Sequence, residues 1–524
     1  MKSRKILSAF LAAMLAVSGA MLPASADNEP AHPEKPPVSG DVNCDGKITV
    51  SDAVLIARIN AEDSTVQLND FGRYAADANQ DGDIDSNDLT DILRYIAGII
   101  PTLSYKNVNQ SYSAVNLTKD ITIPEEQEAE TADGFRASQL NFTANLLKAV
   151  AKEKGTEKNM LISPYSVAMA LAMTTNGAKG DTLAEMEKVL GDKLDIAKLN
   201  DSYLKILLDT QQNMKDYSAK LDIANSIWYH QDPERIKVPE QFLRNTVNYY
   251  HASAYAAKDF DEPVINDINS WVFQNTHGMI NGILPKPQSP YDYADVVMIL
   301  VNALAFEADW SVKFRDDQVV MRDFTLQDGT KFKADMMYCE ESDYFESEKA
   351  VGFKKYYDGW KYSYIGILPN EDITVENYIA NLDEKELETF LGSATDKYEL
   401  HISMPKYSYD FDASLKEPLI NMGMPTAFDD SVADFTGLDE SGTLERTAIS
   451  DVLHKTYIKV DQNGTKAGAV TAVIMAKATS VGPSNIKNVN LDRPFLYMIY
   501  DEEAKLPVFI GTVMQPDESE KAKD

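Results

Sequence analysis

Residues 464–479 read GTKAGAVTAVIMAKAT, a run of small residues that ends about 45 residues before the C-terminus. Side chains alternate across a β-strand, so every second residue faces the same side. One of the two sets holds only small or apolar side chains without charge: Thr465, Ala467, Ala469, Thr471, Val473 and Met475. The run nevertheless lies between two loop signals, Asp461–Gly464 and Gly482–Asn485. A loop with the pattern of a buried strand predicts a segment that changes its conformation.

The run alone fits an ordinary alanine-rich strand or loop as well as it fits a segment that changes its conformation. The rest of the chain decides between these two interpretations. His454-Lys455 precedes it and Asp492–Leu496 follows it. Further characteristic segments are 159–180 (with NMLISPYS at its start), 223–225, 268–280, 300–310 and 404–428. In this order, over about 380 residues, they resemble the serpin family, and the run resembles its reactive-centre region.

The resemblance implies an α+β chain with the serpin fold, which has three β-sheets, about eight to nine helices and an exposed reactive-centre loop. We expect its first helix at about Phe135 to Lys154, where leucines and valine recur on a helical period. By resemblance, a polar cluster called the shutter lies under the main sheet and contains Ser163, Ser166, Asn302 and His454. Trp310 lies in the breach, where the loop first enters the sheet. Taken singly, each of these residues also fits an ordinary buried side chain.

The family mechanism implied is suicide inhibition of serine proteases: the protease cleaves the loop, which then inserts as a new central strand. The implied hinge comprises Gly464, Thr465, Lys466, Ala467, Gly468, Ala469, Val470 and Thr471. Lys466 and Val470 differ from the residues that serpins usually have at these hinge positions, but neither forbids insertion of the loop. Family spacing places the reactive bond at Ala478–Thr479, which suits an elastase-like or subtilisin-like protease. A shift of one residue would place Lys477 there and predict trypsin-like targets.

A second pattern near the N-terminus is an internal repeat. Residues 41–52, DVNCDGKITVSD, are echoed 36 residues later by residues 77–88, DANQDGDIDSND. Both copies match a calcium loop of the EF-hand type, with oxygen ligands at fixed spacing and glycine at position 6. The expected ligands are Asp41, Asn43, Asp45, the Lys47 carbonyl, Thr49 (directly or through water) and Asp52, then Asp77, Asn79, Asp81, the Asp83 carbonyl, Asp85 and Asp88. We expect two Ca²⁺ ions, and tighter binding in the second loop because it offers four side-chain carboxylates against three.

Each copy ends in Asp, and only the helix after each loop is clear, so residues 41–100 resemble the type I dockerin module of bacterial cellulosomes. The resemblance implies an α-helical module that docks onto a cohesin module of a scaffolding protein. The implied recognition residues are Val50, Ser51 and Arg58 in the first copy and Ser86, Asn87 and Arg94 in the second. The copies differ at loop positions 10 and 11, Val50-Ser51 against Ser86-Asn87, which argues against symmetric two-way docking.

The composition predicts an exported globular protein. The chain is 44% hydrophobic and carries a net charge of −32, which argues against nucleic-acid binding because phosphates require Lys and Arg. Basic residues at positions 2–5, an apolar stretch and the A-x-A pattern at 24–26 predict a cleaved signal peptide rather than a membrane anchor. The expected segments are a signal peptide (1–26), a linker (27–40), the dockerin (41–100), a linker (101–131), the serpin domain (132–516) and a charged tail (517–524). Cys44 and Cys339 are expected to be free thiols, although export permits a disulfide between them.

Two other functions stay open at this point. A carbohydrate-active enzyme is tempting because such enzymes usually carry dockerins, but the chain lacks the G-x-S-x-G, H-E-x-x-H and P-loop motifs. A non-inhibitory serpin would keep the fold and act as a protease substrate or binding module. The small hinge residues argue against it, so we expect a monomeric, secreted inhibitor held on a cellulosome at the bacterial cell surface.

Overall fold

The computed structural model describes residues 39–44, 47–61, 63, 65–66, 68, 70–78, 84, 86–96, 103, 112–124, 127–212, 219–230, 237–276, 280, 282–287, 289, 293, 296, 298–439, 448–465, 485–517 and 519. The expected signal peptide (1–26) and nearly all of the linker 27–40 lie outside these residues, as does most of the tail. Among the described residues, no helix combines the length and the apolar character that crossing a bilayer requires.

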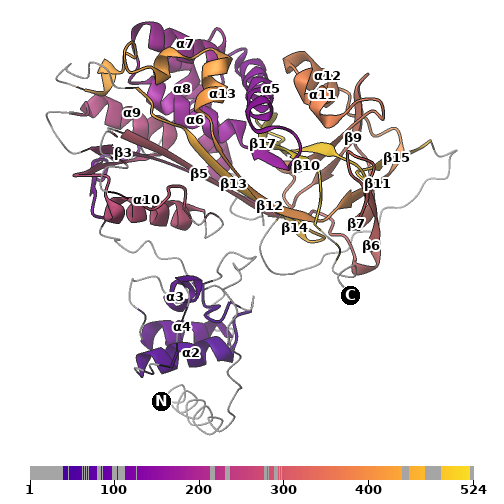
Figure 1. Cartoon of the computed structure of the whole chain (residues 1–524), viewed down its shortest axis with the longest axis horizontal. Helices are drawn as coiled ribbons and strands as arrows, with labels where there is room; N and C mark the ends of the chain where they lie inside the picture. Colours follow the sequence, from indigo (N-terminus) through magenta and orange to yellow (C-terminus); the bar gives the residue numbers. More distant parts are fainter. Residues whose placement is uncertain are drawn as a thin grey trace.

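Three β-sheets form the large domain, as expected (Figure 1). The seven-stranded main sheet has the order β1 (Val115–Asn116), β4 (Ser253–Ala257), β3 (Lys220–His230), β5 (Met298–Asp309), β14 (Gly464–Thr465), β13 (Leu453–Val460) and β12 (Tyr407–Ser414). A six-stranded sheet has the order β2 (Met160–Ile162), β17 (Leu506–Val513), β16 (Phe495–Asp501), β10 (Tyr362–Pro369), β9 (Ala350–Tyr356) and β8 (Tyr344–Glu346). A four-stranded sheet has the order β15 (Ile486–Asn490), β11 (Glu399–Pro405), β7 (Lys331–Glu341) and β6 (Val319–Thr325).

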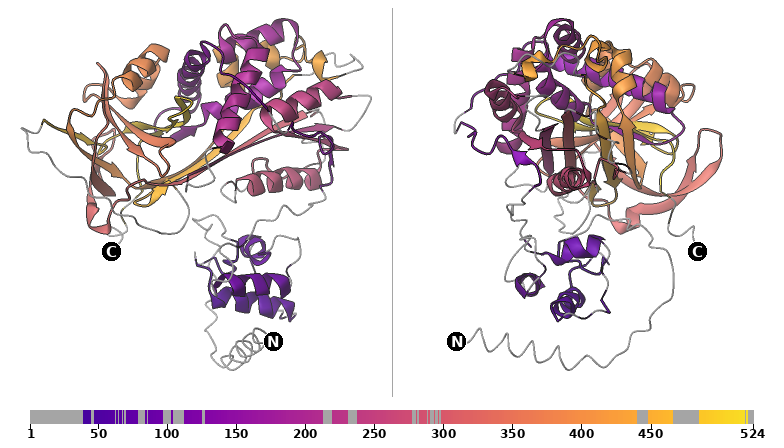
Figure 2. Two further views of the ribbon diagram at one scale, coloured as in Figure 1. Left: turned by 180° about the vertical axis from the view of Figure 1, so that it is seen from behind. Right: turned by 60° about the vertical axis from the view of Figure 1, so that its left-hand side comes forward.

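Nine α-helices lie in the described part of the large domain, which agrees with the expected number. They are α5 (Phe135–Lys154), α6 (Pro164–Thr175), α7 (Gly180–Gly191), α8 (Ile196–Gln212), α9 (Glu240–Tyr250), α10 (Glu262–Asn275), α11 (Val375–Ala380), α12 (Glu384–Gly392) and α13 (Lys416–Met422). Single 3₁₀ turns occupy Asp316–Gln318, Thr426–Phe428 and Thr436–Leu438. Helix α6 and its neighbours cover one face of the main sheet, whereas α10 covers the other face (Figure 1). The four-stranded sheet lies at the far end of the domain from α7–α9 (Figure 2).

The strand patterns show which sheet is buried on both faces. In β13, buried and half-buried residues alternate, so one side of this strand packs on the helices. Strands β10, β16 and β17 are buried at every position, as expected for the centre of a sheet covered on both sides. The six-stranded sheet is therefore the rigid part of the domain, and the main sheet carries the exposed face.

Helix α5 begins and ends at the residues predicted from the sequence. Gly134 and Gly155 flank it, both with positive φ, which glycine adopts without steric cost. Helix α6 starts through a local cap instead: Ser163 Oγ accepts a hydrogen bond from Ser166 N, and Pro164 occupies the first helical position. The S-P-x-S pattern therefore fixes the start of this helix.

Residues 112–118, in the segment expected to be a linker, attach to the edge of the main sheet. Val115 and Asn116 pair with β4, and Leu117 N donates to Ala254 O at 2.7 Å. The Tyr112 ring packs edge-on against Trp228 at 5.7 Å and Tyr255 at 5.3 Å between ring centroids. This segment thus covers an edge strand whose hydrogen-bonding groups would otherwise face solvent.

The small N-terminal domain contains α2 (Val50–Asn60), α3 (Asp70–Ala76) and α4 (Ser86–Ile96). Its core is apolar and includes Ala53, Ile56 and Ile92, all fully buried, with Leu103 beside them. The helices that follow the two repeat loops, α2 and α4, contact each other. The two helices that follow the repeat loops therefore pack together.

Candidate functional site

The start of the small-residue run already lies in the main sheet as strand β14 (Figure 1). Gly464 pairs with Asp309 and Thr465 pairs with Ala308 of β5, while Thr465 also pairs with Val460 of β13. Both pairings are antiparallel. Beyond Thr465 the chain lies outside the described residues, including the hinge positions Lys466, Ala467, Gly468, Ala469, Val470 and Thr471 and the expected reactive bond Ala478–Thr479. The described part therefore holds the entry point of the loop.

The entry point requires its two residues for steric and polar reasons. A Cβ atom at Gly464 would lie 2.0 Å from the carbonyl oxygen of Ala308, so only glycine fits this close approach. Thr465 is 3% exposed, and its Oγ1 lies 2.6 Å from Tyr357 Oη in a hydrogen bond. Burial raises the pKa of Tyr357 well above its ordinary value, so the phenol stays neutral and can donate.

Trp310, the expected breach residue, contacts the turn before the hinge. Its backbone N donates to Asn463 O and its Nε1 donates to Asp461 O, both at 2.9 Å. The indole stacks on the Tyr357 ring, with 4.5 Å between centroids and 9° between planes. Trp310 therefore contacts the turn directly before the residues that pair in β14.

Three of the four expected shutter residues come together. His454 Nε2 accepts from Ser163 N at 3.1 Å, and Ser163 Oγ donates to Val508 O at 2.8 Å. Because the imidazole is buried, its pKa falls to about 4 and it stays neutral at physiological pH. This network joins β13, the start of α6 and strand β17 of the six-stranded sheet.

The fourth shutter residue, Asn302 of β5, has a different described partner. Its Nδ2 donates to Asn225 Oδ1 of β3, the strand directly opposite. Asn225 is 2% exposed, and its own Nδ2 is buried without a hydrogen-bond partner among the described residues. A buried amide donor without a hydrogen-bond partner costs about 1–3 kcal/mol of folding free energy, so it destabilises the main sheet at this place.

A buried ion pair beside Trp310 had no signal in the sequence. Lys355 of β9 is 1% exposed and lies among the breach aromatics, and its partner is Glu341 of β7 at 2.7 Å. Cys339 lies next to this pair, and burial raises the pKa of its thiol to about 12. A lysine in a strand ordinarily faces solvent, so only the fold reveals this position. No disulfide joins Cys44 and Cys339 in the structure.

The first repeat loop has the donors that a calcium ion needs. Asp41 is 4% exposed and Asp52 is fully buried. The described partners of Asp52 are neutral: its Oδ2 accepts from Thr49 N at 2.8 Å and its Oδ1 accepts from Asn43 N at 3.1 Å. Thr49 also caps α2 through Ser51 N. A buried Asp52 carboxylate whose described partners are neutral, beside the buried Asp41, fits the ligand set of a hard cation.

The second repeat loop is described only at its ends. Asp77 is half-buried and Asp88 is fully buried, so its first and last expected ligands resemble those of the first loop. Asn79, Asp81, Asp83 and Asp85 lie outside the described residues, as does Asp45 of the first loop; the Lys47 position is described.

The cohesin-binding positions lie on the two loop-following helices. Val50 is 41% exposed and Ser51 is exposed at the start of α2. Arg58, at the end of the same helix, donates to Asp63 Oδ2 and Thr65 Oγ1, both at 2.8 Å. Ser86, Asn87 and Arg94 lie on α4, but their side chains are outside the described part of the structure.

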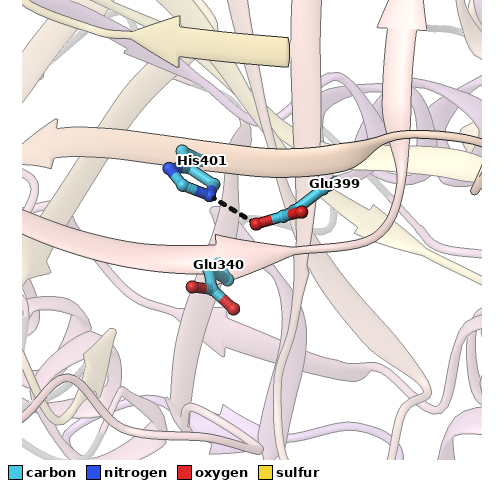
Figure 3. A group of neighbouring side chains, drawn as sticks. All are labelled: Glu340, Glu399 and His401. Atoms are coloured by element: carbon cyan, nitrogen blue, oxygen red, sulfur yellow. Dashed lines mark hydrogen bonds and ion pairs between the residues drawn. The ribbon is translucent and has the colours of Figure 1, made fainter. Parts of the chain in front are cut away.

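An additional cluster lies on the four-stranded sheet (Figure 3). The ligand atoms of Glu340, Glu399 and His401 lie within 4.8 Å of one another, and His401 Nε2 is 3.1 Å from Glu399 Oε1. Both carboxylates are exposed, and the imidazole nitrogen already has a partner. We assign no ion to this cluster and no part in loop insertion.

Two family profiles match the chain. The profile described as serpin (serine protease inhibitor) matches residues 137–516, and the type I dockerin domain profile matches residues 39–97. An uncharacterized serpin-like protein of Thermococcus kodakarensis is 29% identical over 417 residues, which is 79% of this chain and 92% of the relative. A serpin-like protein of Methanosarcina acetivorans is 30% identical over 72% of this chain and 85% of the relative.

Solved structures agree with the fold. The thermophilic serpin tengpin in its native state matches with a TM-score of 0.68 and 38% identity, over 77% of this chain and 99% of tengpin. Tengpin in its latent state matches with a TM-score of 0.63 and 35% identity, over 75% of this chain and all of that structure.

Proposed function

Because the chain belongs to the serpin family and carries a type I dockerin domain, we propose that it is a secreted suicide inhibitor of serine proteases anchored to a cellulosome. The observation that carries the proposal is strand β14, the paired start of the hinge between β5 and β13. A loop that has begun to join the sheet can continue along the same register. The dockerin implies the cellulosome, and the inhibitory activity is our inference.

The existing pairing defines how the rest of the loop would enter. In an antiparallel sheet each step forward on one strand is a step backward on its neighbours. Six residues beyond Thr465 is Thr471, six before Ala308 is Asn302, and six before Val460 is His454. Insertion would thus place the Thr471 hydroxyl between Asn302 and His454. The Asn302 amide and the His454 imidazole would then face this hydroxyl group instead of the space between two separated strands.

The same register explains how the hinge can contain a charged side chain, that of Lys466. Lys466 would lie opposite Glu307 of β5, an opposite-charge pair that contributes roughly 0.2–1 kcal/mol. Its other neighbour would be Lys459 of β13, so the carboxylate of Glu307 would offset a like-charge contact. The small residues Ala467 and Ala469 would face the buried side, where a larger or charged side chain would stop the strand.

The proposed chemistry is acyl transfer arrested before its last step. The protease serine Oγ attacks the Ala478 carbonyl, the bond to Thr479 breaks, and Thr479 gains a free amino group. Ala478 stays esterified to the protease while the segment from Thr465 onward inserts and carries the protease along. Each new ladder hydrogen bond adds only about 1 kcal/mol, so the driving force comes from many bonds together with burial.

Target class follows from the residue before the reactive bond. Ala478 fits the shallow pocket of elastase-like or subtilisin-like proteases. A reactive bond one residue earlier would place Lys477 before it and select trypsin-like enzymes. N-terminal sequencing of the fragment released after cleavage decides the register, since our assignment requires Thr479 as the new first residue.

The dockerin supplies the anchor. We propose that its two repeat loops bind two Ca²⁺ ions and that the domain docks onto a cohesin, with Val50 and Ser51 among the contact residues. We retain the boundaries 1–26 for the signal peptide and 132–516 for the serpin domain. Protection of an extracellular enzyme assembly from proteolysis is the role that joins the two domains.

The decisive experiment mixes the purified mature protein with an elastase-like protease and analyses the products on a denaturing gel. A band at the summed mass that survives boiling in detergent would establish a covalent trapped complex. A clipped inhibitor with full protease activity would instead identify a substrate or a binding module. Subtilisin-like and trypsin-like proteases extend the test to the other pocket classes.

A matched control separates cleavage from trapping. Thr465→Arg leaves residues 477–479 unchanged but introduces a charge at a position that is 3% exposed and contacts Tyr357. Burying this charge opposes entry into the sheet, so the variant should be cleaved at the same bond without forming the complex. A covalent complex of unchanged yield in this variant would contradict insertion through β14.

A further inference from the structure

A buried lysine lies directly under the breach. Lys355 of β9 is 1% exposed, and its Nζ lies 2.7 Å from Glu341 Oε1 on β7. Removing an ammonium group from water costs several kcal/mol unless a partner compensates it, so Glu341 determines where this lysine can lie. The pair joins a strand of the six-stranded sheet to a strand of the four-stranded sheet.

The ammonium group also faces two aromatic rings of the breach. Lys355 Nζ lies 4.6 Å from the centroid of the Phe314 ring and 5.6 Å from that of the Trp310 ring. Both rings are buried, at 4% and 2% exposure, so the attraction between the cation and the rings acts with little solvent screening. The ion pair therefore contacts both rings and contributes to holding them in place.

These two rings belong to the residues that contact the turn before the hinge. Trp310 donates to the carbonyl groups of Asp461 and Asn463, and Phe314 N donates to Gln462 O at 3.0 Å. Through its stacking on Tyr357, Trp310 also supports the hydroxyl that bonds Thr465. A continuous series of contacts thus runs from Lys355 to residues 461–465.

We propose that Lys355 and Glu341 are positioning residues for loop insertion. Their ion pair holds Trp310 and Phe314 so that the chain after Asn463 enters the main sheet in register. Neither residue touches the reactive bond. When the pair is broken, insertion slows, and more acyl-enzyme is hydrolysed before the protease is trapped. This inference rests on the proposed inhibitory function.

The chain provides a matched control in the adjacent residue. Lys354 is 9% exposed and its Nζ also lies 2.7 Å from a glutamate, Glu502 Oε1. Because neighbours in a strand point to opposite faces, Lys354 lies on the other side of the sheet, near the rings of Phe345 and Tyr500. Lys354→Met therefore breaks a comparable buried pair away from the breach.

The experiment measures two quantities for each variant: the moles of inhibitor consumed per mole of protease trapped, and the rate constant of association. Lys355→Met should raise the excess of this consumption ratio over one about fivefold, because about 1 kcal/mol in the insertion barrier slows trapping fivefold relative to hydrolysis of the acyl-enzyme. Association should stay unchanged, because protease recognition occurs at residues 478–479. Glu341→Gln should act in the same direction, and Lys355→Arg, which keeps the charge, should stay near the unaltered protein. An equal rise in Lys354→Met, or no rise in Lys355→Met, would overturn the proposal.

A second measurement needs no protease and separates this proposal from the inhibitory function. If the unaltered protein traps none of the proteases, the proposed function fails, and hydrogen exchange of the uncleaved chain still tests the positioning role. The amides of Trp310, Phe314 and Thr465 should exchange faster in Lys355→Met than in Lys354→Met. Equal exchange in both variants would refute it. Glu341→Gln, which preserves a hydrogen-bond acceptor, serves both measurements if Lys355→Met does not fold.

Discussion

Acidification should weaken the shutter through one residue, His454. The imidazole is 6% exposed and accepts a hydrogen bond from Ser163 N, a role that only its unprotonated nitrogen can perform. Its pKa in the folded protein is about 4, because burial disfavours the charged form. In the unfolded chain a histidine titrates near 6.5. The free energy of unfolding is therefore highest above pH 6.5 and decreases as the pH falls towards 4. The reason is that His454 takes up a proton in the unfolded chain but stays neutral in the folded chain.

The size of the effect follows from the two pKa values. A separation of about 2.5 units corresponds to roughly 3 kcal/mol of unfolding free energy at full protonation, of which about 2 kcal/mol is lost by pH 5. Other groups titrate over the same range, so the informative quantity is a difference. His454→Gln keeps a polar side chain at the same place but has no proton to gain.

The assay is urea unfolding of both proteins at pH 7 and pH 5 with saturating calcium, together with an NMR titration of the imidazole. We expect the unaltered protein to lose about 2 kcal/mol more than His454→Gln between these pH values. The imidazole should show no protonation above pH 5. Parallel losses in the two proteins, or an imidazole that titrates near 6.5, would refute the burial argument.

Three further substitutions test other parts of the molecule. Gly464→Val should expel β14 from the sheet, because its Cβ would lie 2.0 Å from Ala308 O, and hydrogen exchange at residues 464–465 would report it. Tyr112→Ala should lower stability by about 1–2 kcal/mol, measured by urea unfolding, because two aromatic contacts at the sheet edge are lost. In calorimetric calcium titrations, Asp77→Ala should remove the tighter site and Asp41→Ala the weaker one; equal or reversed affinities would contradict the carboxylate count.

Local chemistry made part of the fold predictable. The bounds of α5 follow from its helical period and the glycines that flank it. The start of α6 is equally local, because Ser163 caps its own helix and Pro164 occupies its first position. For both helices, the residues that determine a boundary lie within a few positions of that boundary. Trp310 and His454 stand out for a related reason, since each belongs to a characteristic run of sequence, and their roles in the breach and the shutter stay predictions.

The features that the sequence did not predict depend on contacts between different strands. Lys355 and Glu341 meet only because β9 and β7 belong to two sheets that pack together, and no spacing in the sequence records that packing. The segment from Tyr112 to Thr118 reads as a polar linker, since an edge strand of two residues carries almost no pattern of its own. Its stability comes from Trp228 and Tyr255, more than a hundred residues away.

The arrangement of the main sheet implies that insertion is controlled at two separable points. The breach holds Thr465 and the shutter would receive Thr471, six residues further along, which is about 20 Å of extended strand. Interactions at the breach, including those that start at Lys355, act on the first step of entry. His454, which accepts from Ser163 N, lies beside the proposed position of Thr471, so protonation of its imidazole would act on a later step of insertion. In the proposed mechanism, protease recognition would occur further along still, at residues 478–479. A change at the breach should therefore alter the fate of the acyl-enzyme without altering its formation, whereas acid should ease separation of the strands even when no protease is present.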